Sequence, residues 1–414
     1  MTVTDIRGRI PDSGFDDGIV TVEAGVITYV GSTAEWERMA GGAAPPPAGT
    51  ILPGLVDIHC HGGGGHSFAT TDPEEALAAA RHHALAGTTG VVASIVTAAP
   101  RDMLAQVRSL APLAAEGHIL GIHLEGPFLS GKRRGAQALE FLLDPDPALT
   151  EDLLAAGDGA VRVMTVAPEL PGAGDVIRVL RDAGVVVALG HTDADYELMR
   201  GALAGLGDGA LVTHLANGMP PIHHRSGGPV AAALVAASAG EASVELIADG
   251  VHVDQGFTRL VFAAAAPGRV VLVTDAMAAA GMPDGCYELG PQQVRVASGV
   301  ARLEPGDEGG PPALAGGTSR LLEVVARCAG QAGVPETAAI QAASAVPARV
   351  LGAGTGSGGA APRARGAIAP GMTADLVVTG GEQPRVMRNG RWLSPLSGMT
   401  AYARGVPVPA RLHG

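Results

Sequence analysis

Histidines and carboxylates close six short apolar runs of this 414-residue chain. The runs end in Asp-Ile-His-Cys-His (57–61), His-Leu-Glu (123–125), Leu-Gly-His (189–191), Val-Thr-His (212–214), Asp-Gly-Val-His (249–252) and Val-Thr-Asp (273–275). Because side chains alternate between the two faces of a strand, His59 and His61 share a face and can chelate one ion, while Cys60 points away. Neutral imidazole and carboxylate groups suit zinc, iron or another borderline divalent metal and leave a position for water.

The other strand-end groups extend this His-x-His pair to a metal site. At matching ends stand Glu125, His191, His214 and Asp275. If they were only polar residues of the core or rim, several ionisable groups would converge without a compensating cation, which is energetically unfavourable. The sequence therefore predicts a divalent metal site, with zinc as the first expectation.

Strands and helices must position these groups. The sequence predicts them by a regular alternation of β-branched runs with Ala-, Leu-, Arg- and Glu-rich runs. We expect strands at 55–59, 89–96, 119–125, 161–169, 185–191, 210–214, 244–252 and 270–275. We expect helices at 74–86, 101–116, 149–156, 175–183, 194–206, 229–239, 254–266 and 319–332. Eight strands, each followed by a helix, predict an α/β fold with a (β/α)8 TIM-type barrel, whose active site lies at the C-terminal ends of the strands.

The two ends of the chain do not follow this alternation. Residues 1–50 and 349–414 hold short runs separated by turn residues, which predicts a small β-sandwich domain formed by both termini. The barrel is expected over residues 51–348. The segment 276–317 is long for a connection between strand and helix, and such loops often cover the active site of a barrel.

Composition and charge exclude several classes of protein. Hydrophobic residues make up 47% and charged residues 17%, which excludes intrinsic disorder. The net charge of −13 argues against a nucleic-acid or membrane partner, so an anionic ligand would need a local basic site. Three widely spaced cysteines disfavour a disulfide scaffold or a cysteine-type zinc site. No run is long enough for a secretion signal or a membrane span, so we expect a cytoplasmic protein.

Eight segments carry a resemblance to a known family. They are PGLVDIHCHG (53–62), HLEGPFL (123–129), GHTDA (190–194), THLANGM (213–219), DGVHV (249–253), TDAM (274–277), LAGG (314–317) and GAIAPGMTADLVV (366–378). Over nearly its full length the chain resembles the amidohydrolase superfamily, and within it the N-acetylglucosamine-6-phosphate deacetylases. HLEGP is the most specific segment. Many amidohydrolases bridge their metals with a modified lysine from strand four, whereas this family uses a glutamate from strand three, the place of Glu125.

The resemblance implies a role for each site residue. Glu125, His191 and His214 would hold the main metal, His59 and His61 mark members that can hold a second ion, and Asp275 would be the catalytic residue. One or two divalent ions per subunit are therefore expected. A phosphorylated amino sugar would be contacted by Ala136, Gln137, Asn217, Gly218, Arg225, His252, Leu314, Ala315, Gly316 and Gly317. Arg225 would reach the phosphate, in a homodimer that of the neighbouring subunit, because a guanidinium binds a phosphate bidentately.

Two positions depart from the family pattern. Gly218 stands where many members have alanine, a mild change because the expected contact is through the backbone. Gln137 replaces a histidine that is expected to contact the acetamido group of the substrate. A glutamine amide can donate a hydrogen bond but carries no proton charge, which opens the question of rate and substrate identity.

The implied reaction is hydrolysis of an N-acetyl amide to an amine and acetate. A metal lowers the pKa of bound water from about 15.7 to roughly 7. Asp275 would take the water proton and deliver it to the leaving nitrogen, while the metal and His252 or Gln137 stabilise the oxyanion. Three alternatives stay open: an amidohydrolase of another N-acyl amino sugar, an acyl amino acid or a cyclic amide; a nucleobase deaminase, which HLEGP disfavours; and a non-enzymatic barrel scaffold, disfavoured because no expected ligand is missing.

Overall fold

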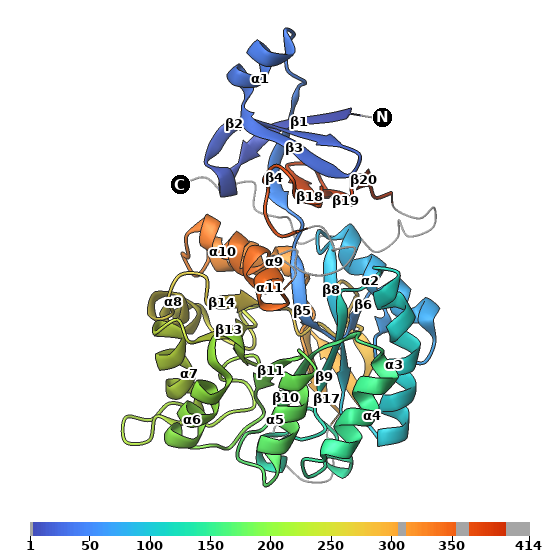
Figure 1. Ribbon diagram of the computed structural model, residues 1–414, viewed down its shortest axis with the longest axis vertical. Helices are drawn as coiled ribbons and strands as arrows, with labels where there is room; N and C mark the ends of the chain where they lie inside the picture. Colours follow the sequence, from blue (N-terminus) through green and yellow to red (C-terminus); the bar gives the residue numbers. More distant parts are fainter. Residues whose placement is uncertain (1–2, 305–311, 353–363, 395–414) are drawn as a thin grey trace.

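The computed structural model describes residues 3–304, 312–352 and 364–394 and contains the predicted barrel (Figure 1). Its eight parallel strands are hydrogen-bonded in the order β14-β13-β12-β11-β10-β9-β8-β5. They are β5 (Val56–Cys60), β8 (Gly90–Val96), β9 (Gly121–Glu125), β10 (Val161–Val166), β11 (Val186–Leu189), β12 (Ala210–Val212), β13 (Ala242–Leu246) and β14 (Val270–Leu272). All eight expected strands are confirmed.

Helices surround the barrel, and each expected helix is present (Figure 1). They are α2 (Pro73–Leu85), α3 (Pro100–Ala115), α4 (Pro147–Gly157), α5 (Ala173–Asp182), α6 (Tyr196–Leu206), α7 (Gly228–Ser238), α8 (Gln255–Ala264) and α9 (Leu321–Gly330). Two short helices that were not predicted follow, α10 (Glu336–Ala342) and α11 (Ala345–Val350). Single 3-10 turns lie at η1 (Pro11–Ser13), η2 (Gly131–Arg133), η3 (Leu139–Phe141) and η4 (Gly207–Gly209). Among the described residues, no helix combines the length and the apolar character that a membrane span requires.

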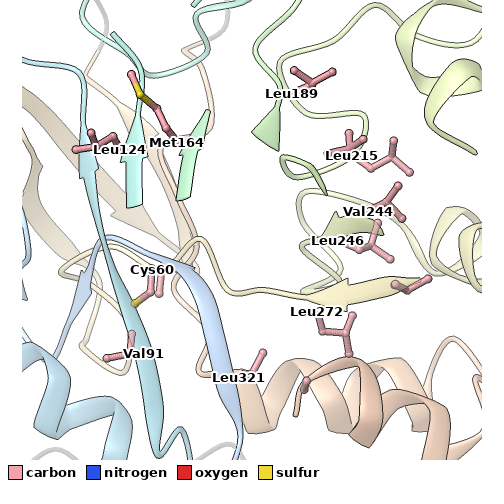
Figure 2. Close-up of a cluster of buried hydrophobic side chains, with 14 of the residues drawn as sticks. Cys60, Val91, Leu124, Met164, Leu189, Leu215, Val244, Leu246, Leu272 and Leu321 are labelled. Atoms are coloured by element: carbon pink, nitrogen blue, oxygen red, sulfur yellow. The ribbon is translucent and has the colours of Figure 1, made fainter. Parts of the chain in front are cut away.

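The barrel is held together by aliphatic side chains, because aromatic residues are only 3% of the chain. The larger cluster lies between the strands and their helices, and Figure 2 shows Leu124, Leu189 and Leu272 as part of it. A second cluster, which includes Val92 and Val163, uses the alternate strand positions and therefore faces the barrel interior. Polar groups at the carboxyl ends of the strands thus stand on a packed core rather than over a pore.

Helix α3 shows how the local sequence builds this packing. Pro100 opens the helix, and Met103, Val107 and Leu110 recur along one face and are all buried. This spacing places a single apolar stripe against the strands.

Replacing one residue of that stripe, Leu110→Ala, is expected to lower the free energy of unfolding by about 2–5 kcal/mol, because the buried site cannot collapse around the smaller side chain. Urea unfolding followed by circular dichroism measures the change. Arg108→Ala on the exposed face of the same helix serves as control and is expected to stay within about 0.5 kcal/mol of wild type. Equal effects of the two substitutions would contradict the packing described.

Both ends of the chain build a separate sheet at the far end of the molecule, above α9 and α11 (Figure 1). Its strands run in the order β20-β19-β18-β4-β1-β2-β3 and form one continuous seven-stranded sheet. They are β1 (Val3–Ile10), β2 (Phe15–Glu23), β3 (Val26–Ser32), β4 (Pro47–Pro53), β18 (Leu376–Thr379), β19 (Arg385–Arg388) and β20 (Arg391–Trp392), with α1 (Thr33–Ala40) between β3 and β4. The division of the chain at residues 50 and 349 stays a prediction, and residues 353–363 and 395–414 of its last part lie outside the described residues.

The long connection after β14 forms a small antiparallel sheet. Its strands are β15 (Gly285–Leu289), β16 (Gln292–Ala297) and β17 (Val300–Leu303). Two further residue pairs, β6 (Gly62–Gly63) and β7 (His66–Ser67), form a tight ribbon directly after β5. Leu289 at the end of β15 reaches the cavity described below, as expected for a loop that covers an active site.

Several barrel strands end before the polar residue that was expected to close them. β11 ends at Leu189 and β12 at Val212, and the expected end of β13 at His252 is wrong by six residues because this strand ends at Leu246. For β11 and β12 the reason lies in the backbone. His191 and His214 have positive φ angles of 46° and 22°, a left-handed conformation that no strand accommodates.

Candidate metal centre and active site

Glu125, the last residue of β9, lies at the centre of a buried cluster of histidines. Its Oε1 is 3.0 Å from Nε2 of His191, 3.0 Å from Nε2 of His214 and 3.5 Å from Nε2 of His59. Its Oε2 is 3.2 Å from Nε2 of His61. The ends of four different strands therefore deliver five predicted metal ligands to one point.

Asp275 joins the cluster from the turn after β14. Its Oδ1 is 3.1 Å from Nε2 of His61 and 3.4 Å from Nε2 of His59. The two histidine Nε2 atoms are themselves 3.2 Å apart. Among the described residues, the donor atoms of His59, His61 and Asp275, and those of His59, Glu125 and His214, form two groups close enough to hold a metal ion.

The outer nitrogens of three of these rings are already bonded, which fixes their orientation. Nδ1 of His59 is 3.0 Å from Oε2 of Glu245, Nδ1 of His61 is 3.2 Å from the carbonyl of Ser94, and Nδ1 of His191 is 2.8 Å from the carbonyl of Arg133. With the proton on Nδ1, each ring turns the lone pair of Nε2 toward the centre. Converging lone pairs and carboxylates in a buried place fit a divalent cation, so the residues present agree with the metal that the motifs imply.

Electrostatics keep the two carboxylates ionised. Burial raises the pKa of Glu125, but His59, His191 and His214, when protonated, outweigh burial and hold this pKa well below its ordinary value. Burial also raises the pKa of Asp275, and protonated His59 and His61 again prevail and lower it. A divalent cation held among neutral rings would act in the same direction. Both side chains therefore offer negatively charged oxygens at neutral pH.

Three residues of the cluster depend on an unusual backbone. His191, His214 and Asp275 have positive φ angles although none is glycine. Such a conformation costs about 1–3 kcal/mol and persists only where the surroundings hold it. Here a hydrogen bond from the Ser130 N–H to the carbonyl of His191 and one from the Asp275 N–H to the carbonyl of His59 are among the contacts that do so.

A cavity of about 200 Å³ opens above the cluster. It is lined by His61, Glu125, His191, His214, Asp275 and most of the predicted substrate contacts, namely Ala136, Gln137, Asn217, Gly218, His252, Leu314 and Gly316. His252 is held by a 2.9 Å bond between its Nδ1 and Oδ2 of Asp249. Asp249 also accepts the backbone N–H groups of Val251 and His252, so the whole turn is fixed by one carboxylate.

Gln137 is oriented by two hydrogen bonds. Its Nε2 donates to Oε2 of Glu125 at 2.6 Å, and its Oε1 accepts the N–H of Thr97 at 2.9 Å. One amide hydrogen is thus committed to the central carboxylate. The second hydrogen on Nε2 is the one that can serve a ligand in the cavity.

Four predicted site residues do not line the cavity. His59 lies beneath it, fully buried. Ala315 is buried in the small core under β15–β17, and Gly317 bonds to the backbone of Asp275 instead, its N–H donating to that carbonyl at 2.6 Å. Arg225 is exposed on the loop between β12 and α7, outside the cavity lining.

Four other residues belong to the site without having been predicted. Leu289 and Ala313 line the cavity from the segment after β14, and Gly135 lines it beside Ala136. Glu245 on β13 supports the cluster from below, since its Oε2 also accepts the N–H of His214 at 3.1 Å. Only Gly135 carried a signal, because it lies next to a quoted position. Leu289 and Ala313 carry no chemistry that would mark them, and Glu245 was expected inside a strand ending at His252, whereas β13 ends at Leu246.

Comparisons with known proteins place this geometry in a family. The family model described as Amidohydrolase family matches residues 50–401. The chain belongs to the amidohydrolase family. This amidohydrolase is 35% identical over 317 residues to an N-acetylglucosamine-6-phosphate deacetylase from Bacillus subtilis, a match that covers 74% of this chain and 78% of the relative.

Two further proteins are similar over most of their length. An N-acetylgalactosamine-6-phosphate deacetylase from Escherichia coli O157:H7 is 34% identical over 351 residues, which covers 84% of this amidohydrolase and 88% of the relative. The structure of a mutant N-acetyl-D-glucosamine-6-phosphate deacetylase from Mycobacterium smegmatis, in complex with N-acetyl-D-glucosamine-6-phosphate, superposes with a TM-score of 0.84 at 38% identity. That match covers 95% of this chain and 99% of the other. The expected resemblance and the barrel are thereby confirmed.

Proposed function

We propose that this amidohydrolase removes the acetyl group from N-acetylglucosamine 6-phosphate and yields glucosamine 6-phosphate and acetate. The observation that carries the proposal is the cavity above Glu125, which brings seven of the predicted sugar contacts over the metal-binding cluster. The similarity to the Mycobacterium smegmatis deacetylase supports the choice of this sugar phosphate. An amidohydrolase of another N-acyl amino sugar or of an N-acyl amino acid is the alternative.

One other substrate has specific support. The Escherichia coli relative is named for N-acetylgalactosamine 6-phosphate, which differs from the first sugar only in the configuration at one carbon. The metal-binding cluster would serve both sugars equally. The assay below therefore includes both.

We assign the main metal to Glu125, His191 and His214, and a second ion to His59 and His61, with Glu125 between them. Zinc is the proposed metal because imidazole and carboxylate donors suit it, as they also suit iron. A cation held there supplies a Lewis acid that generates a nucleophile from water near neutral pH. Glu245, Ser94 and the carbonyl of Arg133 keep the rings turned toward it.

Asp275 is the proposed general base and acid. Its ionised carboxylate borders the cavity beside His61 and accepts a proton from the attacking water. It then donates this proton to the amide nitrogen, without which the amine is a poor leaving group. His252 and the free amide hydrogen of Gln137 donate to the oxygen of the acyl group as negative charge develops there.

The sugar ring is proposed to lie along backbone groups rather than charged side chains. Ala136, Asn217, Gly218, Leu314 and Gly316 all line the cavity. Gly218 has a φ of +60°, and a Cβ at this position would lie 2.8 Å from Nδ1 of His191. Alanine, frequent in the family at this place, would therefore require a shift of the ring here. Ala315 and Gly317 act by shaping the backbone around Leu314 and Gly316.

The phosphate is proposed to be bound by Arg225. Because Arg225 is exposed and does not line the cavity of its own chain, we assign it to the phosphate of a neighbouring subunit in a homodimer. A cytoplasmic location is proposed because the three cysteines are unpaired, as in reducing compartments, and a phosphorylated sugar does not leave the cell freely.

Acetate release tests the substrate. The enzyme is expected to deacetylate N-acetylglucosamine 6-phosphate faster than N-acetylglucosamine, and Arg225→Ala to lower kcat/KM for the phosphorylated sugar by about 10- to 100-fold, the value of one charged hydrogen-bonding group. The same variant should leave kcat/KM for the unphosphorylated sugar unchanged.

Arg108→Ala, which removes an exposed arginine on the barrel helix α3, is the control. N-acetylgalactosamine 6-phosphate is assayed in parallel, and metal content is measured in the same samples. Equal rates on phosphorylated and free sugar would contradict the substrate while leaving the hydrolase intact. A faster rate on the galactose epimer would favour the second substrate.

A further inference from the structure

Within the part of the chain that the structure describes, no strand ladder joins the first and last strands of the barrel. β5 and β14 stand at the two edges of the barrel sheet, and an isolated bridge between Cys60 and Ala276 joins them beyond the end of β14. Side-chain hydrogen bonds also join β5 to the residues just after β14 at this junction, which we call the seam of the barrel. The hydroxyl of Thr274 donates to Oδ2 of Asp57 at 2.5 Å, and the N–H groups of Thr274 and His59 donate to Oδ1 at 3.3 Å each. Asp57 is fully buried and Thr274 is 1% exposed.

Thr274 also holds the turn that carries Asp275. Its Oγ1 accepts the N–H of Ala276 at 3.1 Å, so that one hydroxyl binds the residues on both sides of Asp275 to Asp57. Asp275, between the two residues held by these hydrogen bonds, has a φ of +48°, in the left-handed region. Its own N–H donates to the carbonyl of His59 at 2.9 Å. Hydrogen bonds to neighbouring residues therefore hold the conformation that places the Asp275 carboxylate 3.1 Å from His61.

We propose that Asp57 and Thr274 are positioning residues that hold Asp275 in its reactive place across the seam of the barrel. The inference rests on the proposed role of Asp275 as general base. Neither residue lines the cavity, so both act through Asp275 and contribute no direct contact to the sugar. Loss of the Thr274 hydroxyl releases the turn, and the carboxylate leaves the position from which it reaches the attacking water.

Thr274→Val removes the hydroxyl and keeps the shape. We expect kcat to fall by about 10- to 100-fold, since a displacement of about 1 Å costs this much. KM should stay within about threefold and at least one ion per subunit should be retained, because Thr274 contacts no ligand of the main site. Thr274→Ser retains the hydroxyl and should restore kcat to within about threefold of wild type. Thr150→Val removes an equally buried, hydrogen-bonded hydroxyl from α4 and serves as the matched control.

A double substitution separates positioning from general damage. If Thr274 acts only through Asp275, adding Thr274→Val to Asp275→Asn causes no further loss of kcat. A further loss of tenfold or more in the double variant would overturn the proposal. The two proposals can fail separately. If Asp275→Asn turns over like wild type, Asp275 is not the general base. If Asp275→Asn is impaired but Thr274→Val is fully active, only the positioning role is overturned.

Asp57→Asn provides a second, isosteric variant from the other side of the seam. It presents an amide where Thr274 needs an acceptor, so we expect kcat to fall in the same direction with metal content unchanged. Thermal unfolding accompanies every assay. If neither Asp57→Asn nor Thr274→Val folds at the assay temperature, the pair serves the stability of the barrel and the proposal is overturned.

Discussion

Asp275→Asn is expected to lower kcat by about 10²- to 10⁴-fold, the usual contribution of a general acid and base. Asparagine has the same shape and keeps an oxygen for the His61 side of the cluster, but it cannot accept a proton from water or return one to the leaving nitrogen. The fold and the metal content should therefore stay as in wild type. Steady-state acetate release, metal analysis and circular dichroism on the same preparation measure the three properties.

The matched control for this substitution is Asp146→Asn. Asp146 caps the N-terminus of α4 by accepting the N–H groups of Ala148 and Leu149, and asparagine caps a helix equally well. This variant should turn over like wild type. An Asp275→Asn enzyme with wild-type kcat would end the assignment of Asp275 as the general base.

Glu125→Gln is expected to have the second large effect, through loss of the metal. Glutamine replaces one ligand oxygen by an amide nitrogen, which donates hydrogen bonds and does not bind a cation. The negative charge that faces His59, His191 and His214 is lost at the same time. We expect metal content to fall well below one ion per subunit and kcat/KM to fall by about 10³-fold, several kcal/mol of lost charge stabilisation.

Metal content is the decisive measurement, by mass spectrometry of the purified protein after dialysis. Glu140→Gln in the exposed turn η3 is the control, and it should keep both its metal and its activity. A Glu125→Gln protein with the full metal content of wild type would show that the ion is bound elsewhere.

The sequence predicted the barrel well because two independent signals agreed. Apolar β-branched runs marked every strand, and residues such as Glu125 and Asp275 followed them where a barrel gathers its active site. Strand ends were less predictable. The left-handed turns at His191 and His214 depend on tertiary contacts, and the enrichment of histidine in this conformation is too small to predict them.

The site itself was predictable only where chemistry is visible in a residue type. Nothing about Leu289 distinguishes it from other hairpin residues before the hairpin folds over the cavity. Glu245 was missed because its strand was expected to continue to His252, whereas β13 ends at Leu246 and the Glu245 carboxylate meets His59. Gln137 was noticed as a departure, but its bond to Glu125 follows from the folded loop alone.

The pairing of β4 with β18 has a consequence for folding during synthesis on the ribosome. Leu52 and Val377 are partners in this ladder although more than 300 residues separate them. At a ribosomal rate of roughly 5–20 residues per second, β4 waits on the order of 20–60 s for its neighbour. During that time one edge of β4 has no β18 to pair with, which makes it a target for chaperones and for other nascent chains. A messenger cut short before residue 376 would yield a polypeptide that keeps the histidine cluster and yet leaves this edge permanently open.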